Sequence, residues 1–97
     1  MKVYLSGKIT GDENYRDKFA EAQRIMEAEG HVVLNPAVLP AGLDEPDYMR
    51  IALAMLDSAD MMVCLPDYQE SDGAMAEYGV CRRVGKPVRE IKLPLGV

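Results

Sequence analysis

The fold of this chain is decided by residues 61–85, MMVCLPDYQESDGAMAEYGVCRRVG. Met61 to Leu65 is a continuous apolar run, which is typical of a strand that is buried on both faces of a parallel sheet. Pro66 to Ser71 is polar and predicts a loop. Asp72 to Gly85 has the apolar spacing of an amphipathic helix. This stretch therefore predicts a strand, a loop and a helix in succession.

The same alternation extends on both sides of that stretch. The remaining predicted elements are a strand over 2–6, a helix over 14–29, a strand over 31–35, a helix over Pro46–Ser58 and a strand over Pro87–Lys92. The helix over Pro46–Ser58 is expected to carry Met49, Leu53 and Leu56 on one face. Strands that alternate with helices pair in parallel, because each crossover is long and right-handed. The fold class is therefore α/β: one domain over residues 1–97, a Rossmann-like (flavodoxin-like) three-layer sandwich with a parallel sheet of four or five strands.

Composition excludes several classes of protein. The net charge of −5 over 97 residues argues against a nucleic-acid binder, which uses basic side chains to release counterions. No apolar run approaches membrane length, and the N-terminus lacks the order of a signal peptide. Cys64 and Cys81 form no CxxC motif and have only one His to join them, so no zinc site is expected. We expect a cytoplasmic protein with reduced cysteines and no cofactor or metal.

Parallel α/β sheets bind ligands beyond the carboxyl ends of their strands, which brings residues 6–11, 35–40 and 66–73 together. In the first of these segments, Gly7 and Gly11 would let backbone amides approach an anion, with Lys8 as a point charge. The segment has neither the GxxxxGK[ST] nor the GxGxxG order, so an ordinary turn with an exposed Lys8 remains an alternative. Asn35, at the end of its strand, is a candidate contact to a base or a sugar hydroxyl.

The segment before the last helix carries a more specific signal. Ser71 or Asp72 can cap that helix, whose free N–H groups would suit an anion. Glu77 follows Gly73 by four residues, and helical side chains lean toward the N-terminus, so its carboxylate is expected to project over the glycine. That placement suits a nucleophile or a base, and an exposed helical Glu77 is the alternative.

Four segments of the chain carry a family resemblance. They are residues 3–11, VYLSGKITG; 30–36, GHVVLNP; 58–60, SAD; and 71–77, SDGAMAE. In this order, over nearly the whole chain, they resemble the nucleoside 2-deoxyribosyltransferase superfamily. The likeness is greatest to its small uncharacterised bacterial and phage branch, and more distant to the 2′-deoxynucleoside 5′-monophosphate N-glycosidases.

The resemblance implies a set of roles. Glu77 matches the nucleophile that attacks C1′ of deoxyribose and forms a glycosyl-enzyme ester, and Tyr4 matches the tyrosine that positions it. A second base resolves the ester in transferases, and water resolves it in hydrolases. Ser71 stands where enzymes of free nucleosides carry a carboxylate, so that Ser71 with Lys8 favours a 5′-monophosphate. The implied substrate-binding residues are Ser6, Gly7, Lys8, Ile9, Gly11, Asn35, Tyr68, Ser71 and Gly73. For Tyr68, packing of its own loop is an equal alternative.

One departure from the pattern separates two hypotheses. Relatives carry an acidic residue eight positions before Asp60, where it helps to protonate the leaving base, but this chain has Ala52 there. The first hypothesis is an N-deoxyribosyl hydrolase or transferase acting on a (deoxy)nucleoside 5′-monophosphate. The second is a catalytically weak module that binds or senses a nucleotide in the same pocket. The relatives bury their sites at a subunit boundary, so a homodimer or a higher homo-oligomer is expected, with the second or third helix at the interface.

Overall fold

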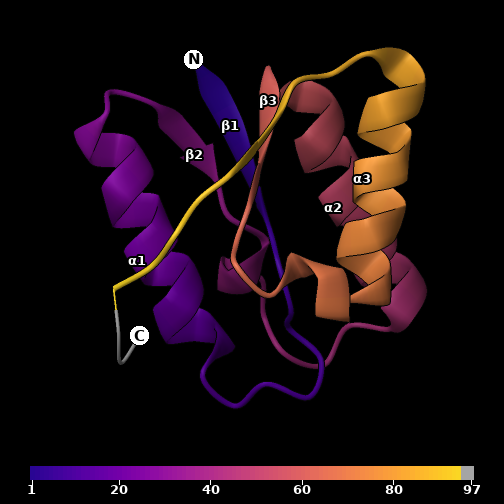
Figure 1. Cartoon of the computed structure of the whole chain (residues 1–97). Coiled ribbons are helices and arrows are strands. Elements are labelled where there is room, and N and C mark those ends of the chain that lie inside the picture. Colours follow the sequence, from indigo (N-terminus) through magenta and orange to yellow (C-terminus); the bar gives the residue numbers. More distant parts are fainter. Residues whose placement is uncertain (95–97) are drawn as a thin grey trace.

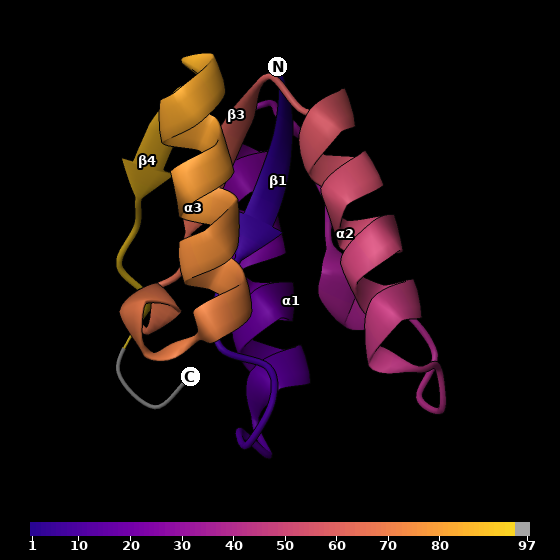
Figure 2. The same ribbon diagram turned by 90° about the vertical axis from the view of Figure 1, so that its right-hand side faces the viewer.

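A computed structural model gives the structure of residues 1–94, so the last three residues of the predicted 1–97 domain lie outside the described part. Four strands form one fully parallel sheet in the order β2-β1-β3-β4, of which Figure 1 labels the first three and Figure 2 labels β4. The strands are β1 (Lys2–Ser6), β2 (Val32–Leu34), β3 (Met61–Cys64) and β4 (Val88–Glu90). The helices are α1 (Tyr15–Ala28), α2 (Glu45–Ser58) and α3 (Asp72–Val84), with short 3-10 helices η1 (Pro36–Val38) and η2 (Tyr68–Glu70). The predicted α/β fold is confirmed, with four strands.

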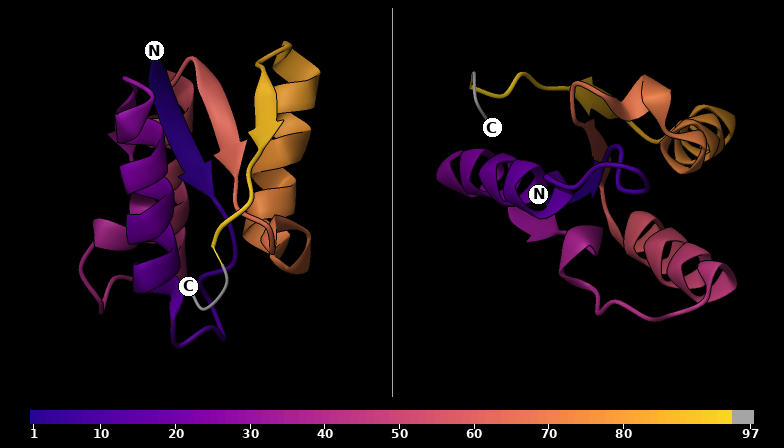
Figure 3. Two further views of the ribbon diagram at one scale, coloured as in Figure 1. Left: turned by 60° about the vertical axis from the view of Figure 1, so that its left-hand side comes forward. Right: turned by 90° about the horizontal axis from the view of Figure 1, so that it is seen from below.

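Helices cover both faces of the sheet and produce three layers. Side chains alternate along β1, so Val3 and Leu5 face α1, whereas Tyr4 and Ser6 face the other side. Helix α1 covers the first face, and α2 and α3 lie together on the second (Figures 2 and 3). One hydrophobic core lies under α1, around Phe19, and the other lies under α2 and α3.

The order of the strands positions the ligand site. The chain runs from β1 to β2 at one side and then returns to β3 on the other side of β1. This reversal between β1 and β3 is the switch point at which open α/β sheets leave a crevice beyond their carboxyl ends. The loops after β1 and β2 and the starts of α2 and α3 all reach that edge.

The expected apolar face of α2 is only partly buried. Leu56 is enclosed, but Met49 and Leu53 are 45% and 37% exposed. Only the C-terminal part of α2 packs against the core, and nearer its start the helix borders a cavity that Met49 and Ala52 line. The spacing of Met49, Leu53 and Leu56 identifies one face of the helix but not what covers it, and this face is buried only near the C-terminal end of α2.

Three further observations bear on function. None of the helices in residues 1–94 is long and apolar enough to cross a membrane. Within the same residues, no group of three or more His, Cys, Asp or Glu side chains could hold a metal ion. Cys64 and Cys81 are both buried as free thiols.

Candidate active site

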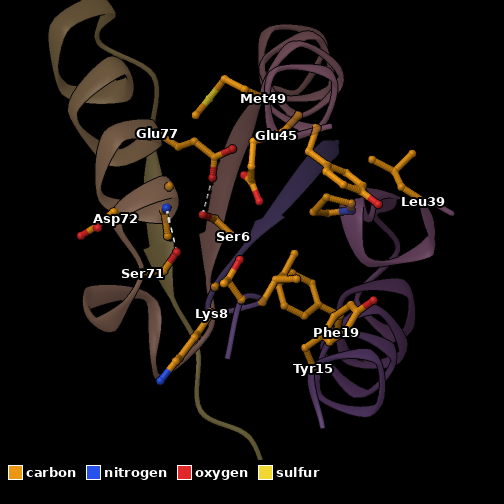
Figure 4. Close-up of a pocket in the computed structure, with 18 of the residues that line it drawn as sticks. Ser6, Lys8, Tyr15, Phe19, Leu39, Glu45, Met49, Ser71, Asp72 and Glu77 are labelled. Carbon is orange, nitrogen blue, oxygen red and sulfur yellow. Dashed lines mark hydrogen bonds between the residues drawn. The ribbon is translucent and has the colours of Figure 1, made fainter. Parts of the chain in front are cut away.

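A cavity of about 810 Å³ opens at the carboxyl edge of the sheet. The loop after β1, the segment between η1 and α2, and the first turns of α2 and α3 line it (Figure 4). Its volume lies within the range of roughly 300–1,000 Å³ that small-molecule sites occupy. The cavity lies where the sheet topology predicts a ligand site.

Glu77 lies in the wall of this cavity and is held by two hydroxyl groups. Tyr4 Oη donates a hydrogen bond of 2.5 Å to Glu77 Oε2, and Ser6 Oγ donates one of 2.7 Å to Oε1. Both donors come from the same face of β1, two residues apart, and meet the second turn of α3. The Glu77 side chain is therefore fixed in one orientation toward the space beyond the sheet.

The charge of Glu77 is not balanced by a cation. Glu77 is only 6% exposed, and no Lys, Arg or His side chain of residues 1–94 forms an ion pair with it. Burial raises the pKa of Glu77 above the usual value of a glutamate, and the hydrogen bonds from Tyr4 and Ser6 partly oppose this rise. Burial and the neighbouring Glu77 also raise the pKa of Tyr4, so that its hydroxyl stays a donor. A desolvated carboxylate that keeps hydroxyl donors and faces a cavity can act as a nucleophile or a base.

The start of α3 has the predicted form. Ser71 is the N-cap, and its Oγ accepts a 3.1 Å hydrogen bond from the Ala74 N–H, so the predicted cap is confirmed at Ser71 rather than at Asp72. At Gly73 an added Cβ would meet only Ser71 Oγ, at 3.8 Å. The space beside Gly73, one turn before Glu77, is therefore open to a ligand.

Lys8 lies at the rim of the cavity. Its Nζ is 3.8 Å from Glu70 Oε1, and both side chains are partly exposed. The Lys8 backbone N–H donates to Asp67 Oδ1 at 3.1 Å, which holds the loop after β1 against the loop after β3. An anionic ligand that reaches Lys8 must compete with Glu70.

The two glycines of the first loop have structural requirements. A Cβ on Gly7 would lie 2.9 Å from Leu65 Cβ and 3.2 Å from Asp67 Oδ1, so only glycine permits this approach of the two loops. Gly11 has φ +81° in a turn closed by the Asp12 N–H and the Ile9 carbonyl, a conformation that favours glycine. Gly7 and Ile9 line the cavity, whereas Gly11 does not.

Two other residues predicted to contact the ligand have side chains that bond or pack outside the cavity. The Asn35 side chain is 7% exposed; it caps η1 by accepting from the Ala37 N–H and donates to Gln23 Oε1. Tyr68 is 6% exposed and packs against Tyr78, with ring centroids 6.0 Å apart. Neither lines the cavity, so the structure gives Asn35 and Tyr68 packing and capping roles in place of the predicted ligand contacts. For Tyr68 this agrees with the packing alternative.

The sequence pattern missed several cavity residues. Helix α2 contributes Glu45, Tyr48 and Met49, and α1 contributes Tyr15 and Phe19. The charged side chains that line the cavity are one ammonium and four carboxylates, namely Lys8, Glu45, Glu70, Asp72 and Glu77. Pro46 at the start of a helix, directly after two acidic residues, was the available signal for the position of Glu45.

Comparison with known proteins gives a family and a fold. The model of the family described as "Domain of unknown function (DUF4406)" matches residues 1–90. The chain belongs to this family. No curated protein matches the chain by sequence at a significant level.

A solved structure supplies the fold comparison. The 2-deoxyribosyltransferase from the psychrotolerant bacterium Bacillus psychrosaccharolyticus superposes with a TM-score of 0.74 at 23% sequence identity. The match covers 100% of this chain and 75% of that chain. At this identity the DUF4406 chain and the transferase share a fold, and that fold is the one predicted from the sequence.

Proposed function

We propose that this protein cleaves the N-glycosidic bond of a 2′-deoxynucleoside 5′-monophosphate, with Glu77 as nucleophile and Tyr4 as the residue that positions it. The observation that carries the proposal is the geometry of Glu77: a buried carboxylate, bonded to Tyr4 and Ser6, that faces an 810 Å³ cavity without a balancing cation. The fold shared with a 2-deoxyribosyltransferase supports this choice of chemistry.

The reaction follows the two-step course of retaining glycosidases. Glu77 attacks C1′, the bond from C1′ to the base nitrogen breaks, and a glycosyl ester forms on the carboxylate. A second base resolves the ester by transfer, or water resolves it by hydrolysis. The hydroxyl of Ser71 and the ammonium of Lys8 would bind the 5′-phosphate at the rim, once Lys8 exchanges Glu70 for the phosphate.

Two further elements complete the proposal. Exposed apolar side chains on α2 and α3 favour a homodimer in which a second copy of the domain covers them; they are Met49, Leu53, Met75, Val80 and Val84. The two buried free thiols, Cys64 and Cys81, fit a protein of the reducing cytoplasm.

The test measures base release. The protein is incubated with each 2′-deoxynucleoside 5′-monophosphate and with the matching nucleoside, with and without a second free base, and products are separated by chromatography. Glu77→Gln keeps the shape of the side chain and removes the nucleophile, so release and exchange should fall by roughly 10³-fold or more. Asp47→Asn, at a carboxylate of α2 that pairs with Arg50 and does not line the cavity, is the control and should stay within about threefold of the original protein.

Trapping the ester tests the covalent step directly. A 2′-fluoro arabinosyl analogue slows both steps, because fluorine at C2′ destabilises positive charge at C1′, and the added sugar should appear in the intact mass of the protein but not in that of Glu77→Gln. Undiminished release by Glu77→Gln would contradict the assignment of the nucleophile. Tight binding without any release would favour the second candidate, a nucleotide-binding module, for which the missing carboxylate at Ala52 is the supporting observation.

A further inference from the structure

The base must be protonated as it leaves, and the Glu77 cluster (Glu77, Tyr4 and Ser6) contains no group that can donate this proton. When the bond to C1′ breaks, its electron pair passes to a ring nitrogen of the base, and protonation of that nitrogen makes the base a better leaving group. Glu77 is ionised in its role as nucleophile and cannot supply this proton. Another titratable side chain of the cavity must do so.

Most titratable groups in the cavity either already donate a hydrogen bond to another group or point away from the cavity. Tyr4 already donates to Glu77, and Tyr48 Oη donates to the Pro40 carbonyl at 2.6 Å. The Asp72 carboxylate points away from the cavity, on the outer side of α3 (Figure 4).

Three more titratable groups lie at the rim of the cavity or point away from Glu77. Lys8 and Glu70 form an ion pair with each other, and the Lys8 side chain extends away from Glu77 (Figure 4). The Tyr15 hydroxyl, on α1, also points away from Glu77 (Figure 4).

Glu45 is the remaining group, and its position is suitable. It is the first residue of α2, the wall opposite α3, and its carboxyl group extends into the cavity (Figure 4). Its carboxylate makes no hydrogen bond or ion pair with any residue of the described chain, 1–94. Ala52 follows seven residues later on the same helix face and presents only a methyl group, which leaves room for a base beside Glu45.

We propose that Glu45 is a second catalytic residue, which protonates the departing base and then deprotonates the acceptor. In the first step the Glu77 oxygen bonds to C1′, the bond from C1′ to the base breaks, and the Glu45 proton moves to the base nitrogen. In the second step the Glu45 carboxylate takes a proton from water or from an incoming base as that group attacks C1′ and releases Glu77. The inference rests on the proposed function. It places the acid at the start of α2, two helical turns before Ala52.

The experiment uses leaving groups that differ in their need for a proton. An ordinary purine 2′-deoxynucleotide needs protonation, whereas its N7-methylated form carries a positive charge and releases a neutral base without it. Glu45→Gln should lower kcat/KM for the ordinary purine by about 10²-fold, the low end for general acid catalysis, and change the N7-methylated substrate by less than about threefold. Asp47→Asn is the matched control, because Asp47 lies in the same turn of α2 but pairs with Arg50 outside the cavity, and it should leave both substrates unaffected.

The outcomes separate this inference from the function on which it rests. Equal losses on both substrates in Glu45→Gln, or no loss on either, overturn the role of Glu45 while base release that needs Glu77 upholds the function. Absence of release by the original protein, or full release by Glu77→Gln, overturns the proposed function and this inference together. Glu45 is exposed, so Glu45→Gln should unfold at the same temperature as the original protein, and a circular dichroism melt checks this.

Discussion

Two polar clusters of this domain balance their charge in different ways. On the α1 side, the Lys18 ammonium bridges the carboxylates of Asp12 and Asp67, here called the Lys18 cluster. On the α3 side, the Glu77 cluster pairs a buried carboxylate with two neutral hydroxyls. The first cluster lies outside the cavity, and the second lines it.

The difference appears in the direction of the pKa shifts. The hydrogen bond from Lys18 lowers the pKa of Asp12, and although burial alone would lower the pKa of Lys18, its bonds to Asp12 and Asp67 raise it. Both shifts stabilise charged forms, as structural ion pairs do. At Glu77 burial dominates and raises the pKa, which disfavours the charged form. Glu77 is therefore expected to be more reactive than Asp12, because its charged form is less stabilised and it lies beside the cavity.

The largest expected effect on stability comes from breaking the Lys18 cluster. Lys18→Met leaves two partly buried carboxylates facing each other, and loss of one partner from a buried pair costs about 3–5 kcal/mol. Since the carboxylates are about one-fifth exposed, we expect about 2–3 kcal/mol, or a melting temperature lower by roughly 10–20 °C.

Two checks belong to this stability measurement. Arg24→Met, which removes an exposed cation from the same helix, should cost less than about 0.5 kcal/mol. The folded-state pKa of Asp12 is lowered, so the contribution of the Lys18 cluster is present above the unfolded value and is lost as pH falls through the folded one. The gap between Lys18→Met and the original protein should therefore narrow in acid, and a constant gap down to pH 2 would contradict an electrostatic cause.

The next effect comes from Tyr4→Phe in the Glu77 cluster. The change removes a hydrogen bond to a charged group, worth about 1.5–3 kcal/mol, so base release should fall about tenfold to a hundredfold. Because this hydrogen bond lowers the pKa of Glu77, its loss raises that pKa further, and the nucleophile must be ionised to react. The acidic limb of the kcat/KM profile should therefore move to higher pH. Tyr78→Phe, at the next residue of α3, should leave the limb in place; a shift in both variants would point to a general packing effect.

The smallest effect concerns the rim. Glu70→Gln frees Lys8 from its partner and removes one of four carboxylates from the cavity lining, so the ratio of kcat/KM for a 5′-monophosphate to that for the free nucleoside should rise by about threefold to fivefold. Steady-state kinetics on both substrates measures the ratio. If Asp72→Asn raises it equally, the effect is one of overall charge and not of Lys8.

Short stretches of sequence were enough to predict the helices and strands and part of the candidate site. The buried run over 61–65 predicted β3, which spans Met61–Cys64, and the helix predicted from Pro46 begins at Glu45. The cap at Ser71 depends only on neighbours within one helical turn and appears as predicted. The Glu77 carboxylate bonds to Tyr4 and Ser6 of β1, and none of its atoms lies within 4 Å of the position that a Cβ on Gly73 would take. Helix starts, strand boundaries and i to i+4 relations are set by short-range sterics and hydrogen bonding, so sequence contains them.

Contacts between segments that are distant in the chain were harder to predict from the sequence. Asn35 follows β2 and Tyr68 begins η2, yet their side chains contact Gln23 and Tyr78. Position along a strand predicts which edge a residue reaches, but the neighbour that its side chain meets depends on packing with helices from elsewhere in the chain.

By itself, the sequence determined the alternation of strands and helices, the parallel sheet and the common face of Tyr4 and Ser6 on β1, because periods of 2 and 3.6 are local properties of the backbone. Only the tertiary structure decided that α3 would cover that face, so that Glu77 meets donors 73 and 71 residues away. It likewise decided that Glu45 would face the cavity from α2. The physical reason is that a charge becomes desolvated, and a carboxylate acquires partners, only when separate elements pack together.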